Sequence, residues 1–277
     1  MQELRTLGWL EGQNLVLEYR WAEGRDRRLY TLAAALVGLP VAVMVVSTSL
    51  ASRAAKQETT TIPIVMIAGG DPVEREFVAD LARPGGNITG VGGMGPKLSG
   101  KRLELRKEAI PAVTRIAVLA HLTVSAAGQS VAELEGAARA LGVQLQGVAV
   151  YQPRACEPSL KEATHAGAGA LVVLPAVLFA SHQKQLAALA LQHRLPAIFS
   201  ERGFAQVGGL MAYGPERRER WQRVAYYIDR ILKGAKPSDL PVQQPMKFEL
   251  VINLTTAQAL GLTMPPSLLF QADELIR

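Results

Sequence analysis

Polar turns that follow apolar runs carry the residue types that could bind a small anionic ligand. The first contains Ser47, Thr48 and Ser49 and comes directly after the run Val41–Val46. Small hydroxyl side chains, together with the unpaired backbone N–H groups at the start of a helix over Leu50–Lys56, suit a carboxylate such as that of an amino acid. The same residues also suit an ordinary helix N-cap, and the sequence leaves both interpretations open.

The second polar turn, Gly70 and Asp71, follows the apolar run Ile62–Ala68. Asp71 could accept a hydrogen bond from a ligand ammonium group, and Gly70 would let the backbone approach the ligand closely. The alternative is that Asp71 caps a helix over Val73–Leu81 that has Pro72 in its first turn. We expect the turn to line a binding cleft whichever role the Asp71 side chain has.

Further candidates follow the strands expected in the second half of the chain. They are Thr123, Pro175, Ser200, Glu201 and Tyr213. Glu201 and Tyr213 are the expected polar contacts, and Phe179 or Phe204 could supply a ring that stacks on the ligand. A single aromatic residue belongs more often to the core, so the core remains the alternative for both phenylalanines. The segment Pro175–Val177 is apolar, which indicates a less polar ligand.

The chain lacks the sequence patterns of the common catalytic and cofactor sites. Its four histidines do not show the HExxH spacing of a zinc site, and the sequence has no Gly-x-Ser-x-Gly elbow and no Walker-type phosphate loop. The glycines of Gly90–Gly95 do not keep the dinucleotide-binding spacing, and the single cysteine, Cys156, has no obvious base beside it. We therefore expect a binding protein without catalytic residues, metal or cofactor.

Expected strands and helices alternate almost throughout the sequence, which is the pattern of a doubly wound α/β fold. Runs such as Val41–Val46 and Ala170–Leu174 are apolar throughout and indicate strands buried on both faces of a parallel sheet. The expected strands are Asn14–Arg20, Val41–Ser47, Ile62–Ala68, Asn87–Gly92, Arg115–Ala120, Val143–Val150, Ala170–Pro175, Pro196–Ser200, Gly209–Tyr213 and Phe248–Ile252. Amphipathic helices expected between them include Arg28–Leu39, Ser130–Leu141 and Trp221–Leu232.

Segments rich in glycine and proline separate two α/β series of similar size, at Ala82–Pro96, Val207–Pro215 and Lys236–Pro245. We expect the chain to cross three times between two lobes. The first lobe would contain residues 1–91 and 214–243, and the second residues 92–213 and 244–277. A hinge of several strands would let the lobes close around a ligand.

Composition excludes several classes of protein. Of the 277 residues, 49% are hydrophobic and 19% are charged, which supplies a core and excludes a disordered chain. No apolar run reaches the roughly 18 residues of a membrane-spanning helix. Thirty Lys and Arg against 24 Asp and Glu give a net charge of +6, but acidic residues interleave in the basic clusters, such as Lys97–Lys107. This pattern indicates solvated helix faces, so we expect no nucleic-acid partner.

A series of segments, in order along the chain, carries the pattern of a known family. They are Leu7–Leu15, Glu18–Ala22, Thr60–Val65, Gly70–Val73, Leu81–Gly90, Leu98–Leu105, Gly208–Pro215, Ile231–Pro237 and Phe248–Asn253. Together they resemble the ABC-transporter solute-binding proteins of the periplasmic-binding-protein type I fold, in the subfamily that includes binders of tryptophan and other aromatic amino acids. The resemblance implies two doubly wound lobes, a periplasmic location, and a receptor that captures a small-molecule solute and docks on an ABC permease. It also implies ligand contacts at the turn of Ser47, Thr48 and Ser49.

The sequence departs from this family at its start. It opens in what we expect to be the last turns of a helix that ends at Gly8. Family members first have a signal peptide, a strand and most of a helix. Because that strand lies inside the sheet of the first lobe, we expect its absence to leave two neighbouring strands unpaired and to remove cleft residues. We expect a monomer, with the shortened first lobe as the surface through which a dimer would form.

Two other functions compete with that of a receptor. A ligand-sensing module that reports occupancy to a signalling partner would carry an appended kinase or DNA-binding segment. A cytoplasmic α/β enzyme would need a convergent acid–base or phosphate site. The sequence contains neither feature, so it favours the solute-binding component of an ABC importer, with an amino acid or an aromatic carboxylate as the solute.

Overall fold

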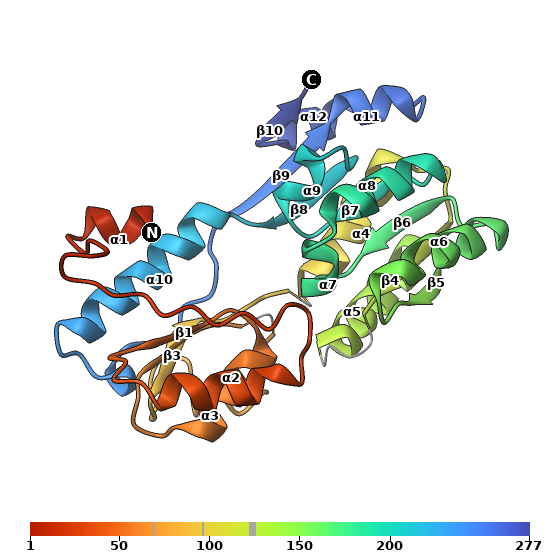
Figure 1. The fold of residues 1–277 in the computed structure, drawn as a ribbon. Helices are drawn as coiled ribbons and strands as arrows, with labels where there is room; N and C mark the ends of the chain where they lie inside the picture. Colours follow the sequence, from red (N-terminus) through yellow and green to blue (C-terminus); the bar gives the residue numbers. More distant parts are fainter. Residues whose placement is uncertain (69, 96, 122–125) are drawn as a thin grey trace. The chain divides into compact units, whose positions relative to one another are not determined.

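The computed structural model describes residues 1–68, 70–95, 97–121 and 126–277. The chain forms two compact units, coloured along the sequence in Figure 1. The first unit contains Met1–Met94 and Glu216–Lys247, and the second contains Gly95–Pro215 and Phe248–Arg277. The chain therefore passes three times from one unit to the other.

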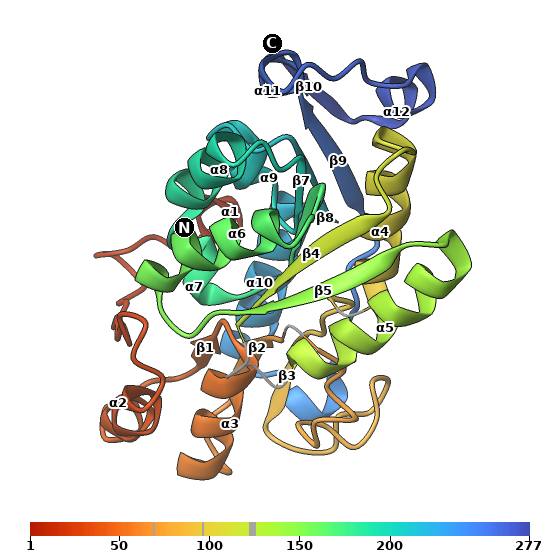
Figure 2. The ribbon, with the colours of Figure 1, turned by 90° about the vertical axis from the view of Figure 1, so that its right-hand side faces the viewer.

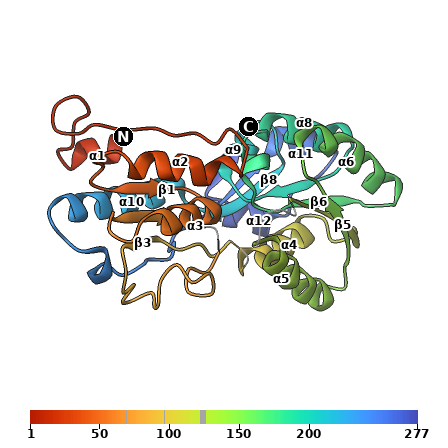
Figure 3. The ribbon, with the colours of Figure 1, turned by 60° about the horizontal axis from the view of Figure 1, so that its bottom comes forward.

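The first unit is built on a three-stranded parallel sheet in the order β1-β2-β3. Its strands are β1 (Met44–Val46), β2 (Ile64–Ile67) and β3 (Ile88–Val91). Its helices are α1 (Gln2–Thr6), α2 (Arg28–Val37), α3 (Ser49–Glu58), α10 (Arg217–Leu232) and the short 3-10 turn η2 (Pro237–Asp239). Helix α2 lies beside α3, as Figures 1 and 3 show.

Strand β2 is buried on both faces, because helices cover each of them. Ile64 and Met66 belong to a core cluster that includes Ala55 of α3. Val65 and Ile67 belong to another cluster, which includes the buried side chains of α10. The uninterrupted apolar run of the sequence therefore forms a central strand of a three-layer α/β/α arrangement.

The second unit is built on a seven-stranded sheet in the order β10-β9-β8-β7-β6-β4-β5, in which only β8 and β9 pair antiparallel. Its strands are β4 (Arg115–Ala120), β5 (Gln144–Ala149), β6 (Ala170–Val173), β7 (Ala197–Phe199), β8 (Met211–Pro215), β9 (Phe248–Asn253) and β10 (Glu274–Ile276). Its helices are α4 (Lys97–Ala109), α5 (Ala126–Leu141), η1 (Pro153–Ala155), α6 (Cys156–His165), α7 (Val177–Ala180), α8 (Gln183–Gln192), α9 (Arg202–Gln206), α11 (Leu254–Ala259) and α12 (Pro266–Gln271).

The large sheet is also covered on both faces. Ala117 and Leu119 of β4 pack with side chains of α6 and α8, while Ile116 and Val118 pack with side chains of α4 and α5. Figure 2 shows these two pairs of helices on opposite sides of β4 and β5. The doubly wound α/β fold expected from the sequence is therefore confirmed.

Two predicted elements are wrong. Asn14–Arg20 is not a strand: beyond the single bridge between Glu11 and Leu15 it joins no sheet, and β1 is the edge of the three-stranded sheet. Val73–Leu81 is not a helix, because Glu76 adopts a left-handed conformation with φ of 58°. That turn directs Phe77 into the core of the first unit. The strand β10 was not predicted.

The helix predicted to end at Gly8 is present as α1, and Gly8 supplies the positive φ of 88° that the turn after it needs. Among the described residues, no helix combines the length and the apolar character that crossing a membrane requires.

Candidate ligand-binding site

The polar turns of the first unit lie at one edge of its sheet. Strands β1 and β2 are parallel, with Val46 opposite Met66, so both strands end at the same edge. The turn of Ser47–Ser49 follows β1 there, and Gly70 and Asp71 follow β2. The register therefore brings the two turns to the same edge of the sheet, while their predicted contact with a ligand stays a prediction.

Thr48 is the N-cap of α3. Its Oγ1 accepts a hydrogen bond from the backbone N–H of Ala51 at 3.0 Å, and its carbonyl oxygen accepts from the backbone N–H of Ser52 at 2.9 Å. The capping interpretation is therefore correct, but it does not exclude ligand binding. A hydroxyl that accepts can still donate its own hydrogen, and the N–H groups of Ser49 and Leu50 at the first turn have no acceptor within the helix.

Asp71 also caps a turn. Its Oδ1 accepts from the backbone N–H of Val73 at 2.9 Å and more weakly from that of Glu74 at 3.4 Å. The capping alternative for Asp71 is thus correct even though no helix follows. The half-buried carboxylate keeps a second oxygen that could accept from a ligand.

Arg75 is a buried cation at this edge that sequence reasoning missed. Its side chain packs against Gly70 so closely that a Cβ there would lie 2.8 Å from Arg75 Nη2. Burial lowers the pKa of Arg75, and the positive charge of Arg53 acts in the same direction. A positive charge held against a glycine turn suits an anionic group of a ligand.

The second unit gathers its candidates in the same way. Strands β4, β6, β7 and β8 are parallel, and their register sets Val173 beside Leu119 and Ala212 beside Phe199. The residues that follow these strands therefore meet at one edge of the large sheet. Of the predicted site residues, Pro175 follows β6, Ser200 and Glu201 follow β7, and Tyr213 lies within β8, one residue beyond its pairing with β7. Thr123, the remaining candidate, lies outside the described residues.

These four side chains differ in exposure. Ser200 is buried, whereas Glu201 is exposed at the start of α9 and makes no capping bond to it. Tyr213 is half-buried, and its ring stacks on Phe248 with a centroid distance of 6.2 Å and an interplanar angle of 29°. Pro175 is half-buried beside α7. The edge thus combines an exposed carboxylate with an oriented aromatic ring.

Phe179 and Phe204 belong to the core. Both are buried; Phe204 stacks on Phe199 at 4.4 Å, and Phe179 meets the ring of His121 edge-on at 6.4 Å. The alternative interpretation of both phenylalanines is therefore correct, and neither presents a free face to a ligand.

The interpretation of Lys97–Lys107 as a solvated face is wrong for two of its arginines. Arg102 and Arg106 are 1% and 2% exposed, because their four-residue spacing puts both on the buried face of α4. Arg102 Nε donates to the backbone oxygen of Tyr213 at 2.8 Å, which places this guanidinium directly behind a candidate site residue. A buried arginine and a solvated one look the same in a charge pattern.

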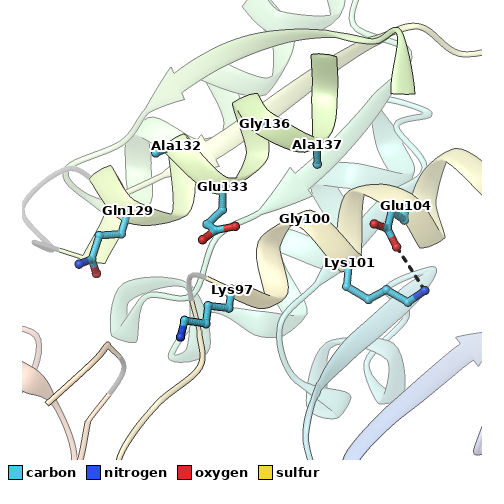
Figure 4. A pocket seen from close by; sticks show the side chains of 9 residues that line it. All are labelled: Lys97, Gly100, Lys101, Glu104, Gln129, Ala132, Glu133, Gly136 and Ala137. Atoms are coloured by element: carbon cyan, nitrogen blue, oxygen red, sulfur yellow. Dashed lines mark ion pairs between the residues drawn. The ribbon is translucent and has the colours of Figure 1, made fainter. Parts of the chain in front are cut away.

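A surface groove of about 670 Å³ lies between α4 and α5, and Figure 4 shows the residues that line it. Lys101 and Glu104 form an ion pair of 3.3 Å at one side of it. None of the predicted site residues lines this groove, so it is separate from the strand ends. It is lined by Lys97, Gly100, Lys101, Glu104, Gln129, Ala132, Glu133, Gly136 and Ala137.

The described residues contain no group of three or more His, Cys, Asp or Glu side chains that could hold a metal ion. Cys156 is buried, and burial raises the pKa of its thiol, which makes it a poor nucleophile. The strand ends are thus equipped for hydrogen bonding and stacking.

Comparison with known proteins decides the family. The family model described as ABC transporter substrate binding protein matches residues 1–276. The chain belongs to this family of ABC transporter substrate-binding proteins. Two predictions from the sequence, the family and the type I fold of its members, are thereby confirmed, and the coarse function is that of a substrate-binding protein.

Individual relatives of this substrate-binding protein agree with that assignment. It is 25% identical over 266 residues to a tyrosine-binding protein of Clostridioides difficile, with 95% of this chain and 75% of the relative covered. The structure of the ABC domain in complex with L-Trp from Streptococcus pneumoniae is similar, with a TM-score of 0.89, 26% identity, and 99% and 93% of the two chains covered. A conserved domain protein from Vibrio cholerae has a TM-score of 0.91, 27% identity, and coverages of 99% and 92%.

Proposed function

We propose that this protein is the extracytoplasmic receptor of an ABC importer and that its solute is an amino acid with an aromatic side chain. The observation that carries the proposal is the family match over residues 1–276, together with relatives that bind tyrosine or were solved with L-Trp. The chemistry of the strand ends supports the same class of solute.

The first unit offers donors for a carboxylate. The Thr48 hydroxyl, the first-turn N–H groups of α3 and the cation of Arg75 all lie at the edge where β1 and β2 end. An ionised carboxylate gains most from several such donors, because hydrogen bonds to a charged group are the strong ones. We assign the α-carboxylate of the solute to this edge.

The second unit offers the partners for the rest of an amino acid. The exposed carboxylate of Glu201 can accept from an α-ammonium group. The ring of Tyr213, already fixed by Phe248, and the apolar Pro175 suit an aromatic side chain. We assign the ammonium group and the ring of the solute to this edge.

Capture by such a receptor needs no covalent chemistry. We propose that the solute closes the two units around itself, and that the closed form docks on a membrane permease. Binding can favour the closed state only by the difference in affinity between the closed and open states. The three passages of the chain between the units supply the segments that would bend.

Thermal unfolding in the presence of a solute panel tests the proposal. Because a ligand that binds only the native state raises the unfolding temperature, L-tryptophan, L-tyrosine or L-phenylalanine should raise it at millimolar concentration. Two compounds serve as controls: glucose has no carboxylate, and benzoate has no ammonium group. Stabilisation by glucose alone, or by none of the amino acids, would contradict the proposed solute class.

A further inference from the structure

Helix α4 carries two buried arginines that make different contacts. Arg106 donates from both Nη atoms to the backbone oxygen of Val113, at 3.2 Å each, near the start of β4. Arg102 donates from Nε to the backbone oxygen of Tyr213 at 2.8 Å and from Nη1 to that of Gly95 at 3.5 Å. Arg106 therefore contacts the end of the sheet that lies away from the candidate site, whereas Arg102 contacts the backbone of the candidate site residue Tyr213.

Burial of a charged guanidinium costs desolvation free energy, so hydrogen bonds to the group must offset that cost. Burial lowers the pKa of both Arg102 and Arg106 to about 10, while Tyr213 and Glu201 act on Arg102 in the opposite direction. The charged form is thus held in a place that disfavours it, with carbonyl oxygens as its hydrogen-bond partners. For Arg102 these carbonyls belong to the first residue of the second unit and to the end of β8.

The segment of β8 around Tyr213 packs against Ser200. In the parallel pairing of β7 and β8, Phe199 lies opposite Ala212, so Ser200 and Tyr213 come next in line. The backbone at Gly214 packs directly on Ser200, and a Cβ at this glycine would overlap the Ser200 carbonyl oxygen. The backbone beside Tyr213 is therefore in direct contact with the turn of Ser200 and Glu201.

We propose that Arg102 is a positioning residue of the ligand site in the second unit. Its guanidinium fixes the backbone of Tyr213, while Phe248 fixes the ring, and together they hold Tyr213, Ser200 and Glu201 in the geometry that the solute requires. Arginine suits this role because its planar fork presents Nε and Nη1 to two carbonyls at fixed angles. This inference rests on the proposed function, since it assigns the solute to these residues.

Lysine at position 102 is the informative variant, with Arg106→Lys as its matched control. Both changes keep a buried positive charge on the same face of α4 and remove the fork. We expect Arg102→Lys to raise the Kd for L-tryptophan or L-tyrosine by about tenfold or more, as measured by titration calorimetry. Arg106→Lys should leave the Kd within about twofold, although urea unfolding should show that both variants lose stability.

A second readout tests the positioning without any ligand. With 3-fluorotyrosine incorporated, the ¹⁹F resonance of Tyr213 can be assigned by its loss in Tyr213→Phe. Arg102→Lys should shift this resonance, and Arg106→Lys should not. If the lysine variant does not fold, Arg102→Gln, which keeps amide donors without the charge, takes its place in both measurements.

The outcomes separate this inference from the proposed function. An unshifted resonance in Arg102→Lys would overturn the positioning role, whether or not the protein binds an amino acid. A shifted resonance with an unchanged Kd would overturn the link between Arg102 and the solute. If the wild-type protein binds no aromatic amino acid, the proposed solute fails, while the ¹⁹F shift still decides whether Arg102 holds Tyr213.

Discussion

Thr48 has two roles in this account, and substitutions can separate them. Its Oγ1 caps α3 through the N–H of Ala51 at 3.0 Å, and its hydroxyl hydrogen is assigned to the carboxylate of the solute. Thr48→Ala removes both roles. Loss of an N-cap costs about 1 kcal/mol of folding free energy. Loss of a hydrogen bond to a charged group costs about 1.5–3 kcal/mol of binding, which is roughly a 10- to 100-fold rise in Kd.

Thr48→Asp keeps the cap and opposes the ligand. Aspartate is an excellent N-cap, and its charge is favourable at the N-terminus of a helix, so the variant should be at least as stable as the wild type. The same charge repels a carboxylate at this turn, so binding should weaken by about 100-fold or more. Thr48→Ser, which keeps the cap and the hydroxyl, should behave like the wild type in both respects.

The assay combines urea unfolding for stability with titration calorimetry for the affinity of L-tryptophan or L-tyrosine. The expected pattern is an alanine variant that is less stable and binds weakly, beside an aspartate variant that is stable and binds about 100-fold more weakly than the wild type or worse. Wild-type affinity in the aspartate variant would refute the assignment of the carboxylate to this turn. Thr48 would act only as a cap if Thr48→Ala alone lost affinity and if its loss of binding free energy equalled its loss of folding free energy.

Three further predictions concern stability. Lys233 lowers the pKa of Asp229 through a hydrogen bond. The ionised carboxylate therefore stabilises the native state above pH 3.8, and this stabilisation is lost as the pH falls through the lowered pKa. The difference in urea midpoint between the wild type and Asp229→Asn should shrink over the same pH range. Gly70→Ala should displace the end of the Arg75 side chain and weaken solute binding, as measured by calorimetry, while it costs less than about 1 kcal/mol of unfolding free energy because that side chain is flexible; an unchanged affinity would contradict the role of Arg75 at this turn. Gly136→Ala, in the open interior of α5, should instead stabilise by about 0.5–1 kcal/mol in urea unfolding, and a loss there would show hidden crowding.

Much of the fold follows from apolar runs. Segments such as Ala170–Val173 are apolar at every position, which only a strand covered on both faces requires, and the structure buries each residue of that strand. Asn14–Arg20 has the composition of a strand, but a strand forms only beside a partner strand. The sequence of a single segment does not show whether such a partner is present. At Glu76 the positive φ accompanies the burial of Phe77, a tertiary contact that a local helix pattern does not contain.

The places of the polar turns were predictable where a turn follows a strand, while their contact with a ligand stays a prediction. In the first unit the predicted polar turns follow β1 and β2, and in the second unit they follow β7, because parallel strands of one sheet end at the same edge of that sheet. Arg75 and Arg102 were not predictable, because burial of an arginine depends on how a helix or turn packs. Spacing alone puts Arg102 and Arg106 on one face of α4, but it does not say which face is buried.

We propose that the protein binds an aromatic amino acid through its carboxylate. Parallel calorimetric titrations of the wild-type protein with L-tryptophan and with L-tryptophanamide, which replaces the carboxylate by a neutral amide, test it most directly. We expect saturable binding of L-tryptophan and an affinity for the amide that is weaker by about 100-fold, since several donors lose their charged acceptor. Equal affinity for both compounds, or heat of binding with neither L-tryptophan nor L-tyrosine, would contradict it.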